Sequence, residues 1–446
     1  MPVRSRVVMN ETARKLLRSI QSQKAGIGIL GLGYVGLPLA MAFVRKGFRV
    51  TGVDLDSHRV AKLNQGLSYV EDVPTKDVRI AVAKGRFKAT NQFDVLADVD
   101  AIIICVPTPL NRAKDPDLSY VSQAMESVQK NLRAAQLIIL ESTTYPGTTE
   151  EIALPILERS GLKVGQDFFL CFSPERIDPG NQRFPLHKIP KVVGGITLSS
   201  TQLGCALYGQ VVERVVPVSS ARTAEMAKLL ENTFRIVNIG LVNELAQVAD
   251  ALKIDIWETI EAASTKPFGF MPFYPGPGIG GHCIGVDPLY LSWKARLQGV
   301  DIHFIELARR INTEMPRFVV ERAVYALNAR ARKAASISRI LVLGVSYKRD
   351  VADTRESPAF EVIHLLKSLG AKVTYHDPFV PRLENDTVQL QSEKLTPKTL
   401  RSKDLVIVTT HHSKVDYALV AKEAGLIFDT RNVDWPQKYA SKVIRL

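Results

Sequence analysis

Cysteine is scarce in this sequence, and the few cysteines lie far apart. The 446 residues include only Cys105, Cys171, Cys205 and Cys283, with no CxxC pair among them. A disulfide framework or a structural zinc site needs cysteines paired at short spacings. We therefore predict neither a disulfide scaffold nor a metal site, and we expect a protein of the reducing cytoplasm.

Long apolar runs are equally rare. One uncharged stretch, residues 26–44, has the length of a membrane span, but it contains several glycines and Pro38. These residues are typical of a turn followed by a helix and do not suit a lipid-facing segment. The first 24 residues are basic and lack the apolar core of a secretory signal. They favour a short amphipathic helix over a targeting peptide, and no membrane association is predicted.

Acidic residues are in the minority. Lys plus Arg number 58 against 45 Asp plus Glu, which gives a formal charge of +13. A surplus of this size suits nucleic acid, anionic membranes or phosphorylated small molecules. Aromatic residues make up only 7% of the chain, and no basic stripe is interleaved with them, so nucleic-acid binding is not expected. Phosphorylated small molecules remain as partners.

Short apolar runs alternate with helical patterns through most of the chain. Because parallel neighbouring strands need crossover connections, this alternation predicts parallel sheets with helices on both faces. Between residues 219 and 331, long amphipathic patterns replace the strands. The predicted fold class is α/β, with two Rossmann-like, doubly wound parallel-sheet domains joined by a helical middle domain. The predicted boundaries are 1–25 for an N-terminal extension, 26–218 for the first sheet domain, 219–331 for the helical domain and 332–446 for the second sheet domain.

The individual elements are predicted from apolar runs bounded by turn residues. Strands are expected at residues 27–30, 48–53, 101–106, 137–140, 168–172, 339–344, 372–376, 404–410 and 426–429. Helices are expected at residues 35–46, 221–252, 301–328 and 358–369.

A glycine-rich turn follows the first predicted strand. It consists of Gly31, Gly33, Tyr34, Val35 and Gly36, in a GxGxxG pattern. Glycines at these positions allow a tight turn and let backbone N–H groups approach a pyrophosphate at a helix N-terminus. Asp54 ends the next strand, at the distance expected of an acid that binds a ribose diol. It favours NAD over NADP because a carboxylate repels a 2′-phosphate, although the nearby Arg59 tolerates one.

Five glycines surround a single cysteine in residues 275–288. Such a backbone fits a loop that wraps closely around a ligand. Cys283, with His282 and Asp287 nearby, is therefore the candidate for an accessible nucleophilic thiol. The other three cysteines are interpreted as small buried side chains.

Several distinctive segments occur in one order along the chain. They are GLGYVGL, Val106 to Pro109, Ser142 with Thr143, Ser173 to Glu175, Lys228 with Asn232, GGHC, and Lys348 to Ser357. Together they resemble the UDP-glucose/GDP-mannose dehydrogenase family over about residues 25–440. Residues 266–278 and 287–295 are most similar to the branch that acts on UDP-N-acetylglucosamine. His282 and Val286 depart from the UDP-glucose pattern, whereas the UDP-N-acetylmannosamine enzymes share GGHC and stay in contention.

The resemblance implies an NAD-dependent, four-electron oxidation of the C6 alcohol of a UDP-N-acetylhexosamine to a carboxylate. Cys283 is expected to form a thiohemiacetal and then a thioester that water hydrolyses. Lys228 and Asn232, four residues apart on one helix, share a face. The resemblance makes Lys228 an acid/base or oxyanion-stabilising group and Asn232 a substrate ligand. It makes Asp287 an organiser of proton transfer and Glu175 an assistant in hydrolysis.

Further contacts are implied by the same resemblance. Cofactor contacts are expected from Thr108, Thr143 and Arg355, and Thr143 is also a candidate to hold a catalytic water. Substrate contacts are expected from Arg176, Gly280 and Lys348, beside Glu175, Lys228 and Asn232. The first sheet domain is then the NAD-binding domain, the last binds the nucleotide-sugar, and the helical domain implies a homodimer or higher homo-oligomer.

Two rival interpretations differ in class. A catalytically silent NAD-binding sensor or scaffold has little reason to keep Lys228, Cys283 and Asp287 together. A two-electron alcohol dehydrogenase of the hydroxy-acid type needs no cysteine, so Cys283→Ser should leave it active. Among nucleotide-sugars, UDP-N-acetylmannosamine and UDP-glucose are the alternatives to UDP-N-acetylglucosamine.

Overall fold

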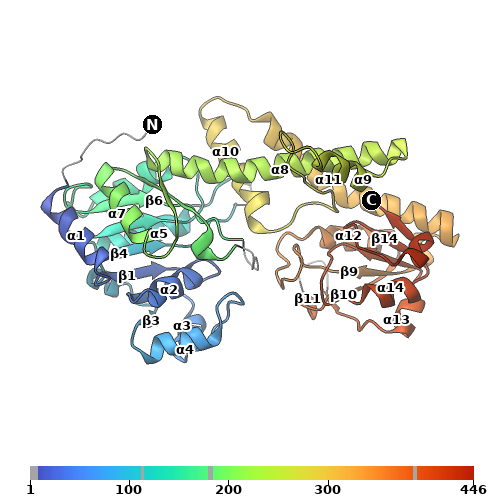
Figure 1. Ribbon diagram of the computed structural model, residues 1–446, viewed down its shortest axis with the longest axis horizontal. Coiled ribbons are helices and arrows are strands. Elements are labelled where there is room, and N and C mark those ends of the chain that lie inside the picture. Colours follow the sequence, from blue (N-terminus) through green and yellow to red (C-terminus); the bar gives the residue numbers. More distant parts are fainter. Residues whose placement is uncertain (1–8, 112–114, 179–183, 385–388) are drawn as a thin grey trace. The chain divides into compact units, whose positions relative to one another are not determined.

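Two sheets organise the chain, one in each of two compact units (Figure 1). The computed structural model describes residues 9–111, 115–178, 184–384 and 389–446, with the side chains of His282 and Cys283 outside the description. Unit 1 comprises residues 1–231 and 289–298, and unit 2 comprises residues 232–288 and 299–446.

Unit 1 is built on an eight-stranded sheet of order β3-β2-β1-β4-β5-β6-β7-β8. The strands are β1 (Gly26–Leu30), β2 (Arg49–Val53), β3 (Phe87–Thr90), β4 (Ala101–Ile104), β5 (Leu137–Leu140), β6 (Phe169–Phe172), β7 (Lys191–Gly195) and β8 (Val215–Pro217). All neighbours are parallel except β6 and β7. The strand order reverses between β1 and β4, which is the topological switch point where open α/β sheets bind ligands.

Alternate strand residues of this sheet face opposite layers of helices, because side chains in a strand alternate sides. Ile27 and Ile29 pack with one core cluster, and Leu30 packs with another on the opposite face. The first layer contains α1 (Glu11–Gln21), α2 (Gly36–Arg45), α3 (Ser57–Asn64), α4 (Thr75–Ala83) and α7 (Leu198–Tyr208). The second contains α5 (Ser119–Lys130), η2 (Thr149–Ala153) and α6 (Leu154–Glu158). The amphipathic helix expected near the N-terminus is α1, which buries Ala13, Leu16 and Ile20.

Helices replace strands between the two sheets. They are α8 (Ala221–Leu252), α9 (Ile256–Ser264), α10 (His282–Leu297) and α11 (His303–Ala326). The division between the units falls within α8, after Glu231, and within α10, after Pro288. The C-terminal half of α11 buries Val319, Val320 and Ala323 in the core of the second sheet.

Unit 2 contains a five-stranded parallel sheet of order β10-β9-β13-β14-β15. Its strands are β9 (Arg339–Leu343), β10 (Lys372–His376), β13 (Leu405–Val408), β14 (Ile427–Asp429) and β15 (Val443–Arg445), beside a hairpin of β11 (Arg382–Glu384) and β12 (Gln389–Gln391). Its helices are α12 (Pro358–Ser368), α13 (Pro397–Arg401) and α14 (Tyr417–Glu423). Short turns of helix complete the chain at η1 (Asp94–Asp98), η3 (Leu186–Lys188), η4 (Leu327–Ala331), η5 (Ala335–Ile337) and η6 (Gln437–Lys442). The α/β class with parallel sheets is thus confirmed, while the predicted domain boundaries stay predictions.

One prediction about the backbone was wrong. The glycine-rich segment expected to be a loop as far as residue 288 becomes helix α10 at His282, so Cys283 lies in the first turn of a helix. The dense glycines and prolines predict a loop, but two of the glycines are required by close packing, because a side chain at either position would clash with a neighbour. A Cβ atom at Gly280 would lie 2.5 Å from Cβ of Tyr347, and one at Gly281 would lie 2.8 Å from a ring carbon of Tyr347.

Candidate functional site

The turn after β1 is shaped for a dinucleotide. Gly31 has φ of +87°, and a Cβ atom at Gly36 would lie 1.8 Å from the carbonyl oxygen of Gly31. At Gly33, by contrast, no described atom lies within 4 Å of an added Cβ, so this part of the turn faces open space. Helix α2 begins at Gly36 without a side-chain cap among the described residues. The N–H of Leu37 already donates to the carbonyl oxygen of Gly33 at 3.1 Å and Pro38 has no N–H, so a pyrophosphate would be bound by N–H groups of the turn that precedes Leu37.

Asp54 stands at the end of β2 facing this turn. Its Oδ2 accepts the N–H of Leu32 at 2.8 Å, and its Oδ1 accepts the N–H of Asp56 at 2.9 Å. Arg59 Nη1 lies 3.8 Å from Oδ2. A carboxylate offers about four acceptor positions, so Asp54 keeps capacity for a ribose diol. A cavity of about 350 Å³ opens here, lined by Gly33, Tyr34, Asp56, His58, Arg59, Lys62, Tyr69 and Val70. These residues fit the adenosine end of NAD.

Hydroxyl groups gather at the carboxyl edge of the same sheet. Thr108 follows β4 and is buried, and Thr143 follows β5 and is half-buried. The hydroxyls of Thr144, after β5, and Ser173, after β6, are buried without a hydrogen-bond partner among the described atoms. Buried hydroxyls are usually satisfied. Such orphaned groups at this edge are consistent with a ligand or ordered water that completes them.

Glu175 and Arg176 follow β6 and are both engaged. Glu175 Oε1 accepts the N–H groups of Arg176 and Ile177 at 2.5 Å each, and Oε2 lies 3.1 Å from Lys191 Nζ. The guanidinium of Arg176 lies 2.6 Å from Glu231 and donates to the carbonyl oxygen of Pro190 at 2.8 Å. A substrate contact of Arg176 stays a prediction.

Lys228 lies on α8, where it is buried. Among the described residues it forms no hydrogen bond or ion pair that would occupy its ammonium group. Buried lysines are normally paired, because burial of an uncompensated charge is costly. An ammonium group left in this state suits a role toward a bound anion or oxyanion. One turn earlier, buried Glu225 accepts the N–H groups of Gly147 and Thr149 and so anchors the segment after Thr143.

Unit 2 brings Asn232 and Asp287 together from two helices. Asn232 Nδ2, on α8, donates to Asp287 Oδ2, on α10, at 2.6 Å, and both side chains are buried. Position 283 lies one helical turn before position 287 on α10. The Cys283 side chain, on which the predicted chemistry depends, lies outside the described part of the structure.

The remaining predicted site residues lie on or beside a long loop after β9. Lys348, a predicted substrate contact, and Arg355, a predicted cofactor contact, lie on this loop, and Arg355 Nη2 is 2.6 Å from Asp353 Oδ2. The N–H of Gly281 donates to the carbonyl oxygen of Arg355 at 2.9 Å. The glycine-rich segment with Gly280 is therefore packed directly on the loop that carries Lys348.

Sequence reasoning missed several buried polar residues at the carboxyl edge of unit 1. They are Glu141, Lys191, Tyr208, Glu225 and Tyr290, and each is less than a tenth exposed. Tyr290 donates to the carbonyl oxygen of Thr108 at 2.9 Å. None belongs to a short motif; the one signal was a charged residue inside an apolar run, as at Lys191.

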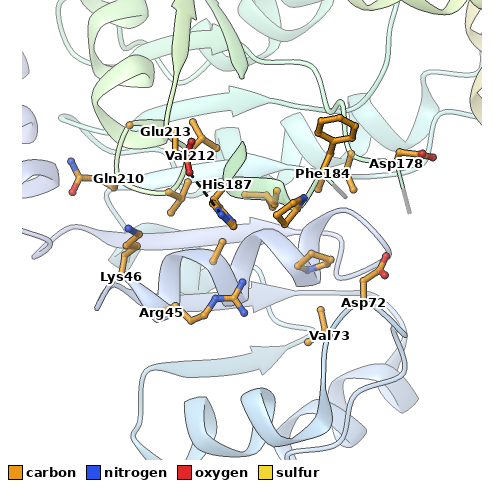
Figure 2. A pocket seen from close by; sticks show the side chains of 17 residues that line it. Arg45, Lys46, Asp72, Val73, Asp178, Phe184, His187, Gln210, Val212 and Glu213 are labelled. Atoms are coloured by element: carbon orange, nitrogen blue, oxygen red, sulfur yellow. Dashed lines mark ion pairs between the residues drawn. The ribbon is translucent and has the colours of Figure 1, made fainter. Parts of the chain in front are cut away.

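A second cavity of unit 1, of about 710 Å³, contains none of the predicted residues (Figure 2). Arg45, Lys46 and Gln210 lie on its rim, and His187 pairs there with Glu213 at 3.9 Å. In the described ranges, no helix is long and apolar enough to cross a membrane. Nor do the described side chains form a cluster of three or more His, Cys, Asp or Glu suited to a metal ion.

The doubly wound sheet, the glycine turn and the acid after β2 define a Rossmann-type, dinucleotide-binding oxidoreductase. Comparison with known proteins makes this specific: the chain belongs to the UDP-glucose/GDP-mannose dehydrogenase family. The NAD binding domain of that family matches residues 25–212, its central domain 222–314 and its UDP binding domain 341–434. The family comprises NAD-dependent nucleotide-sugar dehydrogenases, so the predicted cofactor, NAD, is confirmed.

Individual relatives extend over nearly the whole chain. A UDP-N-acetyl-D-glucosamine 6-dehydrogenase of Salmonella typhi is 38% identical and covers 91% of this chain and 96% of its own. A UDP-N-acetyl-D-mannosamine dehydrogenase of Pyrococcus horikoshii is 36% identical, covering 91% and 95%. The solved structure of a UDP-D-ManNAc dehydrogenase from Pyrococcus horikoshii matches with a TM-score of 0.82 at 34% identity, covering 92% and 96%.

Proposed function

We propose that this protein oxidises the C6 alcohol of a UDP-N-acetylhexosamine, with UDP-N-acetylglucosamine preferred, to the corresponding uronate. The observation that carries the proposal is the buried Asn232–Asp287 pair at 2.6 Å, one helical turn from Cys283 on α10. An oxidation that stops at the aldehyde needs no nucleophilic thiol such as that of Cys283. Oxidation to the acid through a thioester does need one.

The residues divide the work by chemistry. Bound NAD would supply a hydride acceptor, held by the glycine turn, Asp54 and Thr108. Lys228 would stabilise or deprotonate the alcohol oxygen of the substrate. Cys283 would attack the aldehyde carbon to form a thiohemiacetal, loss of a second hydride to NAD would give the thioester, and Glu175 would then assist hydrolysis. Asn232 and Asp287 would hold the substrate and direct a proton.

The NADH yield tests this reaction. Purified protein is incubated with NAD and, separately, UDP-N-acetylglucosamine, UDP-N-acetylmannosamine or UDP-glucose, and NADH absorbance is compared with uronate formed. We expect two NADH per uronate, fastest with UDP-N-acetylglucosamine. Preference for UDP-N-acetylmannosamine would favour the runner-up, which the Pyrococcus horikoshii relative supports. No NADH with any sugar would refute the proposal.

Replacement of the cysteine tests the mechanism. Cys283→Ser should lose complete oxidation, with any residual activity ending at the aldehyde. Cys205→Ser is a suitable control, because Cys205 is a free thiol on α7 within the apolar core and has no proposed role. Equal carboxylate yields from Cys283→Ser and the parent would contradict the thioester route.

We also propose a homodimer formed through the central helices. Leu241, Leu245, Val248 and Leu252 recur at intervals of three or four residues along α8, and each is at least 45% exposed. A stripe of this kind is typical of a helix that packs on a partner. Light scattering should give the dimer mass, and Leu245→Glu should lower it to that of the monomer. A reducing cytoplasm is the proposed location, in keeping with the free thiols of Cys105, Cys171 and Cys205.

A further inference from the structure

A lysine is buried between two carboxylates at the edge of the sheet in unit 1. Lys191, the first residue of β7, is only 5% exposed. Its Nζ lies 2.7 Å from Glu141 Oε1 and 3.1 Å from Glu175 Oε2. The ammonium group thus joins a fully buried acid to the acid proposed for thioester hydrolysis.

The buried side of this arrangement is firmly anchored. Glu141 follows β5, and it accepts a hydrogen bond from the hydroxyl of Tyr208, at the end of α7. Cys105, after β4, places its Sγ 3.6 Å from Glu141 Oε2. Burial raises the pKa of Glu141, and Glu175 adds to that effect, while Lys191 opposes it. For Lys191 burial works against the charged form, but Glu141 and Glu175 outweigh it and raise its pKa.

The outer side is held but still accessible. The Glu175 side chain is 13% exposed, whereas that of Glu141 is fully buried. Two backbone N–H groups fix Oε1 of Glu175, so Lys191 is the side chain that fixes Oε2. A general base must be oriented toward the proton before it can take it.

We propose that Lys191, anchored by Glu141 and Tyr208, is a positioning residue that holds Glu175 in the orientation needed for hydrolysis of the thioester. This inference rests on the proposed function. In the step, the water oxygen bonds to the thioester carbonyl carbon while its proton passes to Glu175. The C–S bond then breaks, its electron pair stays on the Cys283 sulfur, and the proton on Glu175 is returned to that sulfur. The free acid ionises into solvent, so no oxidant is consumed.

The test uses a pair of substitutions that preserves the buried charge balance. Lys191→Met with Glu141→Gln removes one positive and one negative charge, which protects the fold from an unpaired buried ion. With NAD and UDP-N-acetylglucosamine, we expect the first burst of NADH to persist while steady turnover falls about 10-fold or more. Intact-mass spectrometry should show an acyl-enzyme that accumulates.

Two further variants separate positioning from simple structural damage. Lys191→Arg keeps a cationic donor to Glu175 and should keep the burst and the steady rate of the parent. Lys403→Met removes another lysine with a largely buried side chain, 2.7 Å from Glu393 in unit 2, and should leave the partition between burst and steady rate unchanged. If the double variant does not fold, Lys191→Gln, which lacks the length of lysine, should show the same loss of steady rate with the burst retained.

The outcomes distinguish the two proposals. If the parent makes no NADH from any UDP-sugar, the proposed function fails. If the parent yields two NADH per uronate but the folded double variant or Lys191→Gln keeps its burst and steady rate, only the role of Lys191 is overturned. Loss of burst and steady rate together would also overturn that role, because it would place Lys191 in oxidation.

Discussion

The two sheets of this protein use the same aspartate position in opposite ways. In unit 1, Asp54 follows the second strand of its sheet and accepts one N–H on each oxygen. In unit 2, Asp377 occupies the equivalent place after β10, where Oδ2 accepts Val345 and Ser346 N–H groups, as well as His412 Nε2 at 3.0 Å. Oδ1 accepts two more N–H groups. The acid that is open to a ligand in one unit is saturated in the other.

The segments that follow the first strand of each sheet also differ, in length and in what they contact. In unit 1 the chain passes from β1 through five residues to α2, so the helix N-terminus faces the ligand edge. In unit 2, residues 344–357 intervene between β9 and α12. His412 fastens this loop, because its Nδ1 accepts the N–H of Asp350 while Nε2 donates to Asp377. The short turn of unit 1 therefore suits the binding of phosphates, whereas the longer loop of unit 2 carries Lys348.

The largest expected effect is on the saturated aspartate. Asp377→Ala would leave four N–H groups and His412 without their acceptor, so unfolding free energy should fall by about 3–5 kcal/mol. Chemical denaturation measures this change, and NAD affinity of the folded fraction should be unaffected. A loss of stability below about 1 kcal/mol would show that the hydrogen bonds of Asp377 do not contribute to stability as proposed.

A smaller loss is expected where the turn of unit 1 is closed. In Gly36→Ala the new methyl group meets the carbonyl oxygen of Gly31, so stability should fall by about 1–3 kcal/mol, and NAD binding should weaken with it. Gly33→Ala is the matched control, since its Cβ meets no described atom within 4 Å. It should unfold like the parent yet bind NAD more weakly in calorimetry. Equal NAD affinity for Gly33→Ala and the parent would argue against a pyrophosphate at this turn.

Asp54→Ala should change binding more than stability. Loss of a charged acceptor costs about 1.5–3 kcal/mol, so the Kd for NAD should rise about 10- to 100-fold. UDP-sugar affinity, measured separately, should stay within about two-fold. Asp167→Ala removes an acid that accepts the N–H of Lys163 just before β6, at the amino edge of the sheet, and serves as the control. The contrast with Asp377 would disappear if Asp54→Ala proved as destabilising as Asp377→Ala.

The smallest effect contrasts the pH dependence of two buried acids. For Asp377, burial would raise the pKa, but His412 and the backbone N–H groups outweigh it and lower the pKa. Its stabilisation is therefore present above the unfolded pKa and lost only in acid. For Glu225 in unit 1, burial raises the pKa to about 7 despite opposing hydrogen bonds. Its contribution is full below the unfolded pKa of about 4.3 and is lost as pH rises through 7.

Glu225→Gln removes that second dependence. Between pH 6 and 8, the parent should lose about 1 kcal/mol of stability more than the variant does. Urea unfolding at both pH values measures the difference. An identical pH dependence of the two proteins would show that Glu225 does not titrate in this range.

Much of the fold could be predicted because its signals are local. The apolar run at 137–140 and the periodicity at 221–252 coincide with β5 and α8. Short edge strands such as β3, with sequence FKAT, were missed because half of their residues are polar. The start of α10 was also missed. There the glycines serve packing against Tyr347, and composition alone does not distinguish such a glycine from a helix breaker.

The amino-acid sequence by itself determined the glycine turn, the acid after the second strand, the order of the family segments and hence the cofactor. Each depends on residues close together in the chain and on backbone demands that few residue types meet. Only the tertiary structure decided which charges meet. Lys191 contacts Glu141 and Glu175, and Asn232 contacts Asp287, across separations that no local pattern records. Burial makes those contacts important for stability, because a buried charge without a partner costs free energy.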